Sequence, residues 1–281
     1  MTSPGASRTQ RWRVLRRSVT FWVGALIILM WVVFAIFGDV VTSYNPLGTP
    51  NDVLTRLEPP SAEHWFGTDS LGRDVLSRVL AGARQVLTVA LAATVLGTVV
   101  GTFLGLLIGY FGGIVDDIFS RILDAFLSIP LVITGMLALA ALGPNTLGVI
   151  IVIGVVFTPI IAKTVRAATL AERQLDYVTA AQLRKENTLY ILCMEMLPNV
   201  TSVIIVEFTV RLGYAIFTVL ALSFLGFGVE PSIPDWGLAI AQHYSFLTGG
   251  VWWPVLFPAL AIASLVVGVN LLADAISQAM E

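Results

Sequence analysis

Residues 86–111 read VLTVALAATVLGTVVGTFLGLLIGYF, without one charged side chain. This stretch exceeds the roughly 20 apolar residues that a helix needs to cross the hydrocarbon of a bilayer. Five more predominantly apolar stretches lie at 19–37, 118–142, 147–164, 200–227 and 251–273. The long alternation typical of barrel strands is absent, so the backbone must satisfy its hydrogen bonds within helices. We therefore expect an all-α, polytopic membrane protein with six transmembrane helices.

The composition excludes several other classes of protein. Hydrophobic residues make up 57% of the 281 residues, and charged residues only 12%, about half the share in an ordinary soluble domain. That balance excludes a disordered chain and a coiled coil, and the single cysteine, Cys193, excludes a secreted disulfide scaffold. A net charge of −2 argues against a nucleic-acid partner.

The basic residues predict the orientation in the membrane. With six spans, the side of the N-terminus carries Arg8, Arg11, Arg13, Arg16, Arg17, Arg121, Lys163, Arg166, Arg173, Arg184 and Lys185. The opposite side carries Arg56, Arg73, Arg78 and Arg84. Because cytoplasmic loops are enriched in lysine and arginine, both termini are expected in the cytoplasm.

These expectations divide the chain into four segments. They are a cytoplasmic tail at 1–18, a first transmembrane helix at 19–38, an external loop at 39–84 with an amphipathic helix, and a core at 85–281. The core is expected to hold five transmembrane helices and a cytoplasmic loop at 163–199. A cleaved signal peptide is the alternative for the first span, but its apolar run exceeds the usual 7–15 residues.

Residues for catalysis or metal binding are not evident. Neither lysine follows a glycine, so the chain has no phosphate-binding GxxxxGK[ST] loop. His64 and His243 are far apart and belong to no cluster with ligand spacing, so we expect surface loop residues and no metal site. We predict no catalytic residue and no bound cofactor, so the chain itself is not expected to be an enzyme.

One charged pair falls within a predicted span. Glu207 and Arg211 are four residues apart, so they share a helix face and can form an ion pair. Two interpretations remain open. In the first, the two groups only neutralise each other inside the membrane; in the second, they line a translocation cavity and contact a substrate.

The loop between the fourth and fifth spans suits a soluble partner. Asp176 is a plausible N-cap, and Tyr177, Ala180, Ala181 and Arg184 then follow at helical spacing. The small alanines permit close approach of another surface, and the tyrosine offers a broad anchor. A second amphipathic turn runs from 189 to 197. The expected docking residues are Asp176, Tyr177, Thr179, Ala180, Ala181, Leu183, Arg184, Lys185 and Pro198.

This loop resembles the "EAA" loop of bacterial ABC importer permeases. The similarity rests on the run DYVTAA at 176–181 and on Leu-Pro-Asn at 197–199. Two positions depart from the family pattern, with Thr179 in place of a glutamate and Lys185 in place of a glycine. A glycine would permit a left-handed turn between two helices, whereas lysine must either adopt that conformation at a cost or avoid it.

Other blocks are similar to the second permease subunit of the dipeptide, oligopeptide and nickel importers. The first is HWFGTDSLGRDVLSR at 64–78, which we expect to form a turn, an Asp69 cap and an amphipathic helix. The others are LSFLGFGVEP at 222–231 with PDWG at 234–237, Trp252-Trp253 with Phe257-Pro258, and NLLAD at 270–274. Val219 departs from the pattern, because relatives usually carry a glutamate there.

The resemblance implies the type I ABC importer permease fold in the bacterial inner membrane. It implies a half-channel completed by a homologous second permease, with two ATP-binding subunits that hold ATP and Mg, and lipid around the bundle. An extracytoplasmic binding protein would deliver di- or oligopeptides to an external face that includes Glu230, Pro231, Asp235 and Trp236. Nickel or another small solute is the alternative cargo. An ATP-independent secondary transporter or a non-transporting assembly factor is the alternative function.

Overall fold

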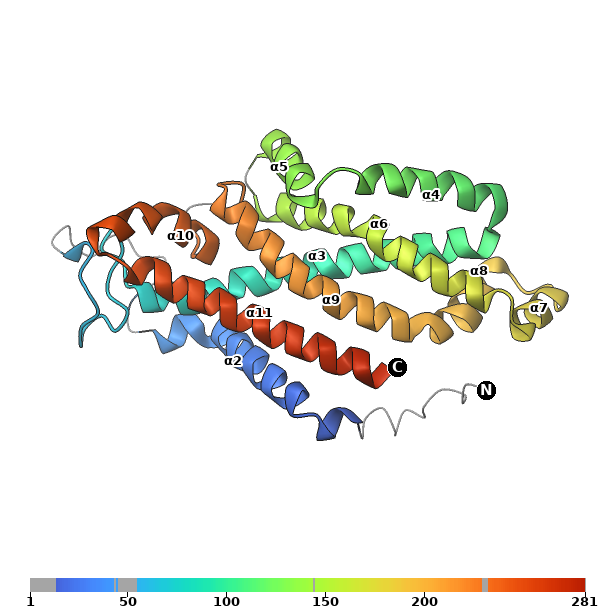
Figure 1. Ribbon diagram of the computed structural model, residues 1–281, viewed down its shortest axis with the longest axis horizontal. Helices are drawn as coiled ribbons and strands as arrows, with labels where there is room; N and C mark the ends of the chain where they lie inside the picture. Colours follow the sequence, from blue (N-terminus) through green and yellow to red (C-terminus); the bar gives the residue numbers. More distant parts are fainter. Residues whose placement is uncertain (1–13, 43, 45–54, 144, 229–231, 281) are drawn as a thin grey trace.

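Long helices dominate the protein, as a computed structural model that describes residues 14–42, 44, 55–143, 145–228 and 232–280 shows (Figure 1). Within these residues, five helices are long and apolar enough to cross a membrane. Four are α2 (Val19–Val41), α3 (Val75–Phe111), α6 (Thr146–Glu172) and α11 (Trp253–Met280). The fifth runs from Thr188 to Phe224 and includes α9 (Leu197–Phe224). The all-helical prediction is therefore confirmed.

The third predicted span is not one straight helix. It is divided into α4 (Gly113–Leu127) and α5 (Leu131–Leu142), which meet at 82°. Pro130 lies at the break, where it has no N–H to donate and disfavours helical geometry in the residue before it. The prediction of a continuous helix over 118–142 was wrong, and a sixth span exists only if the bent pair counts as one.

Glycines bring α3 and α6 into close contact. A Cβ at Gly101 would lie 2.8 Å from the Cβ of Ile161, and a Cβ at Gly105 would lie 2.6 Å from the carbonyl oxygen of Ala162. Gly97 and Gly109 continue the row at four-residue spacing and meet α6 in the same way. Small residues at such a seam let two helix backbones approach and gain dispersion contacts that lipid cannot supply. The α3–α6 pair therefore forms the rigid centre of the bundle.

Helix α9 packs beside this central pair, and one of its faces is not covered by another helix of the described residues. Figure 1 shows α9 between α6 and α11, with α3 behind it. Helix α2 packs on the outside of α11, where Gly24 and Gly268 allow a close crossing. One face of α9 is thus covered by α3, while the opposite face is left uncovered between α6 and α11.

The predicted external amphipathic helix proves to be the start of α3. Asp74, rather than Asp69, is the N-cap, and its side chain accepts a hydrogen bond from the Ser77 N–H at 2.8 Å. Residues 69–72 form a turn in which the Asp69 carboxylate accepts hydrogen bonds from the Leu71 and Arg73 N–H groups. The external segment is therefore shorter than 39–84, because α3 continues without a break from Val75 into the membrane.

Short helices lie at both ends of the bundle. At one end are α7 (Asp176–Leu183), α8 (Thr188–Tyr190) and the π-helical turn Ile191–Met196, which leads directly into α9. At the other end are α10 (Trp236–His243) and the 3₁₀ turn Tyr244–Gly249. Since α6 extends to Glu172, the first part of the expected loop at 163–199 is helical and belongs to the bundle.

Candidate functional site

Helix α7 stands beyond the long helices at one end of the molecule (Figure 1). Its inner side carries Val178 and Ala181, which are both fully buried, and the helix packs on the π-helical turn. Tyr177 is half-buried, and its hydroxyl donates a hydrogen bond to Glu172 Oε2 at 2.6 Å. Burial and the Glu172 carboxylate raise the pKa of Tyr177 to about 12. The inner side thus attaches α7 to the beginning of α9.

The outer side of α7 differs from the predicted docking face. Asp176, Thr179, Ala180 and Leu183 are exposed, and the Leu183 side chain is 79% exposed. Ala181 was expected to face a partner but is fully buried, whereas Tyr177 is only half-buried and its docking role stays a prediction. Asp176 is also not the N-cap, since Leu175 occupies that position and no side chain caps this helix. The surface open to a partner is a stripe at i, i+3, i+4 and i+7.

Lys185 adopts the left-handed conformation, with φ of 57°. Its N–H donates to the carbonyl of Gln182 at 2.9 Å, and the Glu186 N–H donates to the carbonyl of Ala181 at 3.2 Å. Those two bonds form a Schellman motif, in which glycine usually supplies the left-handed residue. The cost of the left-handed conformation at Lys185 is therefore offset by these hydrogen bonds, which satisfy the last carbonyl groups of α7.

The rest of the loop matches the predicted second turn in part. Leu192 and Met196 are buried as expected, whereas Leu189 is exposed. Arg184 lies 3.1 Å from Glu195 and so connects the end of α7 to the turn before α9. Pro198 is exposed at the second position of α9, directly after the π-helical turn.

At the opposite end, Asp235 and Trp236 are buried anchors. The Asp235 carboxylate caps α10 by accepting the Leu238 N–H at 2.9 Å, and it accepts the Ser223 hydroxyl at 3.0 Å. Burial raises the pKa of Asp235, while these hydrogen bonds act in the opposite direction. The Trp236 indole N–H donates to the carbonyl of Val79 at 2.8 Å. Neither side chain is available to contact a binding protein, and Glu230 and Pro231 lie outside the described residues.

Both histidines are buried, contrary to the expectation of surface loop residues. His64 Nδ1 lies 2.9 Å from Asp74 Oδ1. His243 Nδ1 lies 2.6 Å from the carbonyl of Ala239, which can only accept, so Nδ1 carries a proton. Its Nε2 accepts the Ser70 N–H at 3.3 Å, which requires that nitrogen to be unprotonated. His243 is therefore held in its neutral form.

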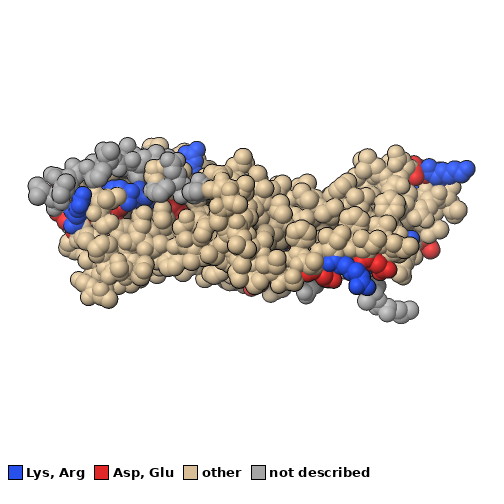
Figure 2. Space-filling model, turned by 90° about the horizontal axis from the view of Figure 1, so that it is seen from above, with Lys and Arg blue, Asp and Glu red and all other residues tan. Residues whose placement is uncertain are grey.

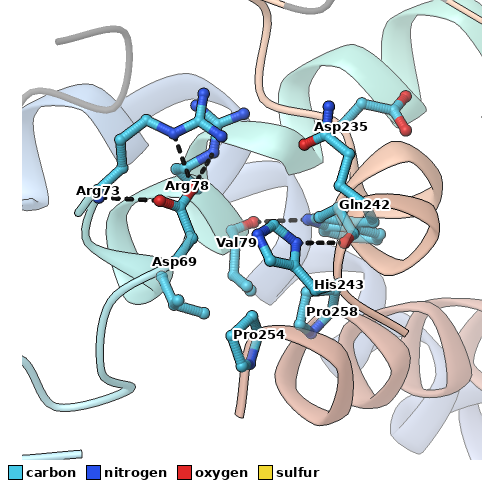
Figure 3. A pocket seen from close by; sticks show the side chains of 12 residues that line it. Asp69, Arg73, Arg78, Val79, Asp235, Gln242, His243, Pro254 and Pro258 are labelled. Atoms are coloured by element: carbon cyan, nitrogen blue, oxygen red, sulfur yellow. Dashed lines mark hydrogen bonds and ion pairs between the residues drawn. The ribbon is translucent and has the colours of Figure 1, made fainter. Parts of the chain in front are cut away.

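Charged groups surround His243 in the small pocket that Figure 3 shows. Asp69, Arg73 and Arg78 line it on the α3 side, and Asp235 and Gln242 come from α10 and its N-cap. Burial lowers the pKa of His243 most, Arg73 and Arg78 lower it further, and Asp69 and the Ala239 carbonyl oppose them.

Acidification is expected to destabilise the fold through His243. An unfolded histidine has a pKa near 6.5, and the folded value is lower, so the unfolded chain binds more protons as the pH falls. The stability that neutral His243 contributes is complete above about pH 6.5 and is lost as the pH falls through the folded pKa, with a slope of at most about 1.4 kcal/mol per pH unit. Thermal midpoints of purified protein between about pH 8 and pH 5 measure this effect. A His243→Gln variant should show a shallower slope, and identical slopes would contradict the assignment.

Glu207 and Arg211 form the predicted ion pair. Arg211 Nε donates to Glu207 Oε1 at 2.7 Å, and the Arg211 guanidinium lies 5.3 Å from the centroid of the Tyr214 ring. Glu207 also lines a cavity of about 260 Å³ between α6, α9 and α11. The sequence did not indicate the hydroxyl groups of this cavity, because they come from three distant helices. They belong to Thr164, Ser202 and Ser277.

The comparisons with known proteins agree with this architecture. The family described as "Binding-protein-dependent transport system inner membrane component" matches residues 101–281, and the "N-terminal TM domain of oligopeptide transport permease C" matches residues 8–60. A putative peptide transport system permease protein of Brucella suis biovar 1 (strain 1330) is 34% identical over 96% of this chain and 90% of its own length. The dipeptide transport system permease protein DppC of Alkalihalophilus pseudofirmus is 35% identical over 97% of this chain and 88% of its own. The di/tripeptide transport system permease protein DppC of Pseudomonas aeruginosa (strain UCBPP-PA14) is 35% identical over 92% and 87%.

Three findings lead to one assignment. The family model matches more than half of the chain, several helices are apolar enough to span a membrane, and the relatives match nearly its whole length. The chain is a multi-pass protein of the inner membrane, and it belongs to the family of binding-protein-dependent transport system inner membrane components.

Proposed function

We propose that this chain is the C-type permease subunit of an ATP-driven importer and forms half of the translocation path for di- and oligopeptides. The observation that carries the proposal is the exposed stripe of α7, which stands beyond the membrane-spanning helices and ends in the exposed Leu183. An exposed leucine that shares a helix face with Thr179 and Ala180 suits the groove of a soluble partner. Peptides as the cargo are supported by the relatives, which are named as peptide and dipeptide transport system permeases.

The proposal assigns the energy source to other subunits. A homologous second permease completes the path, two ATP-binding subunits hold ATP and Mg at the α7 side, and a binding protein delivers peptide on the opposite side. The basic residues near the start of α2 and around α7 support a cytoplasmic location for that end and for both termini. In Figure 1 the start of α2 and the end of α11 both lie towards the end that carries α7. The chain itself performs no catalysis in this scheme.

The contacts of α7 suggest how a partner moves the path. The helix packs on the π-helical turn with Val178 and Ala181 buried, and this turn continues into α9 without a break. A partner that pushes on the outer stripe of α7 therefore acts on α9 through a packed apolar contact, and not through a flexible loop. Rigid elements of this kind transmit displacement as whole-body motion. The expected result is a shift of α9, which carries the ion pair inside the membrane.

Replacing Leu183 with aspartate is expected to release the ATP-binding subunits. The change places a charge in the centre of an apolar contact, where a single anchor residue commonly carries 2 kcal/mol or more, so association should weaken by about tenfold or more. Affinity purification of the tagged chain in mild detergent, with identification of every associated protein, measures the loss. Uptake of a labelled dipeptide by cells should fall in parallel.

The matched control makes the same substitution at the opposite end. Leu71 is also exposed, so Leu71→Asp introduces the same charge without touching α7. It should retain the ATP-binding subunits. If Leu183→Asp also retains them at the wild-type ratio, α7 is not the docking element. If the purified chain alone carries peptide in liposomes under an ion gradient, the protein is a secondary transporter instead.

A further inference from the structure

The ion pair on α9 belongs to a longer polar stripe. Glu207, Arg211 and Tyr214 occupy positions i, i+4 and i+7 and so lie on one face of the helix. Exposure rises along this stripe, from 9% at Glu207 to 57% at Tyr214. The Arg211 guanidinium joins the two ends, since it donates to Glu207 and lies over the Tyr214 ring.

The buried end of the stripe opens into a cavity whose lining is partly apolar, from Val203, Val206 and Met280, and partly polar. Glu207 lines it together with the hydroxyl-bearing Thr164, Ser202 and Ser277 from α6, α9 and α11. These residues come from three helices, so the cavity lies between α6, α9 and α11. The volume of about 260 Å³ is just below the roughly 300–1,000 Å³ of small-molecule sites, so it suits one end of a short peptide.

Lipid is a poor cover for this surface. All three helices are apolar enough to span the membrane, and ionisable groups on membrane-spanning helices face a water-filled space or another protein surface. The Glu207 carboxylate and the hydroxyl groups that line the same cavity offer acceptors to a cation, whereas acyl chains can hydrogen-bond to none of them. Ionisable groups in a membrane are therefore expected on substrate paths.

We propose that Glu207 and Arg211 form a subsite for a zwitterion, in which Glu207 binds the α-ammonium group of a peptide and Arg211, released from Glu207, binds a carboxylate. The inference rests on the proposed function as a peptide permease. The exchange replaces one ion pair with two, so it creates no unpaired charge inside the membrane. The hydroxyl groups of the cavity accept the remaining N–H bonds of the ammonium group, and the exposed Tyr214 marks the side from which the rest of the peptide enters.

Cysteine protection tests the binding step without the binding protein. Cys193 is the only cysteine, so Cys193→Ser with Ser277→Cys places one thiol in the cavity of the assembled complex, in nanodiscs. Dialanine should slow labelling of this thiol by a small methanethiosulfonate reagent, while N-acetyl-dialanine should not. With Glu207→Gln, protection should need a dialanine concentration about tenfold higher, because one charge-assisted hydrogen bond is lost. Equal protection by both peptides, or by neither, overturns the proposal.

A charge exchange separates binding from simple ion pairing. Glu207→Arg with Arg211→Glu retains the intrahelical pair but places a guanidinium in the cavity. If the pair only neutralises charge, the double variant should transport dialanine at the wild-type rate, and that result overturns the subsite. If the pair binds the ammonium group, uptake by both this variant and the isosteric Glu207→Gln falls about tenfold. A wild-type complex that takes up nickel or another solute but no peptide refutes the proposed function instead.

Discussion

Gly105→Val is expected to prevent the chain from folding stably in the membrane. A Cβ at this position would lie 2.6 Å from the carbonyl oxygen of Ala162 and 2.8 Å from the Cβ of Val165. One is a backbone atom and the other is a Cβ, so neither can move aside by a rotamer change. Overfilling a packed core typically costs 1–3 kcal/mol, and here the two branched methyl groups of valine add to the clash. The α3–α6 contact should therefore separate.

The measurement is the yield of monodisperse protein in detergent, together with its thermal midpoint. Gly249→Val is the matched control, since nothing lies within 4 Å of a Cβ at Gly249. It should purify like the wild type. Gly105→Ala should fall between the two, because it adds the clashing Cβ alone. A normal yield and midpoint for Gly105→Val would mean that the α3–α6 seam is wider than the structure shows.

Trp236→Ala is the second large effect that we expect. The indole is 1% exposed, its N–H donates to the carbonyl of Val79, and its ring lies edge-to-face against Trp31 with centroids 4.9 Å apart. Emptying such a site costs about 3–5 kcal/mol, a large fraction of a typical stability of 5–15 kcal/mol. The loss should detach α10 from α3 and α2.

Trp236→Phe separates the hydrogen bond from the packing. It retains an aromatic ring against Trp31 but removes the indole hydrogen bond to the Val79 carbonyl, at a net cost of about 0.5–1.5 kcal/mol, because this carbonyl keeps its hydrogen bond within α3. The thermal midpoint should be highest for the wild type, lower for Trp236→Phe and lowest for Trp236→Ala. Equal thermal midpoints for the wild type and Trp236→Ala would contradict the burial of Trp236 and favour the exposed external position that the sequence predicted.

Much of this architecture follows from the sequence alone. Uncharged runs such as 86–111 can be stable only as helices in a bilayer, because nothing else there satisfies the backbone. The four-residue spacing of Glu207 and Arg211 is a local relation, and the structure confirms their ion pair at 2.7 Å. The position of the loop that contains α7 also follows, since it lies between two unmistakable apolar segments.

The tertiary structure decided which side of each element is buried. Ala180 and Ala181 are adjacent and chemically identical, yet one is exposed and the other is fully buried. His243 and Trp236 lie in a segment that the sequence assigned to an external loop, yet both are buried, and their hydrogen-bond partners Ser70 and Val79 are 173 and 157 residues away in the chain. The cavity at Glu207 needs three helices that are far apart in the chain. Local propensity and hydropathy therefore determined the helices of this protein, whereas long-range packing determined its surfaces, because burial depends on neighbours that no single stretch of sequence contains.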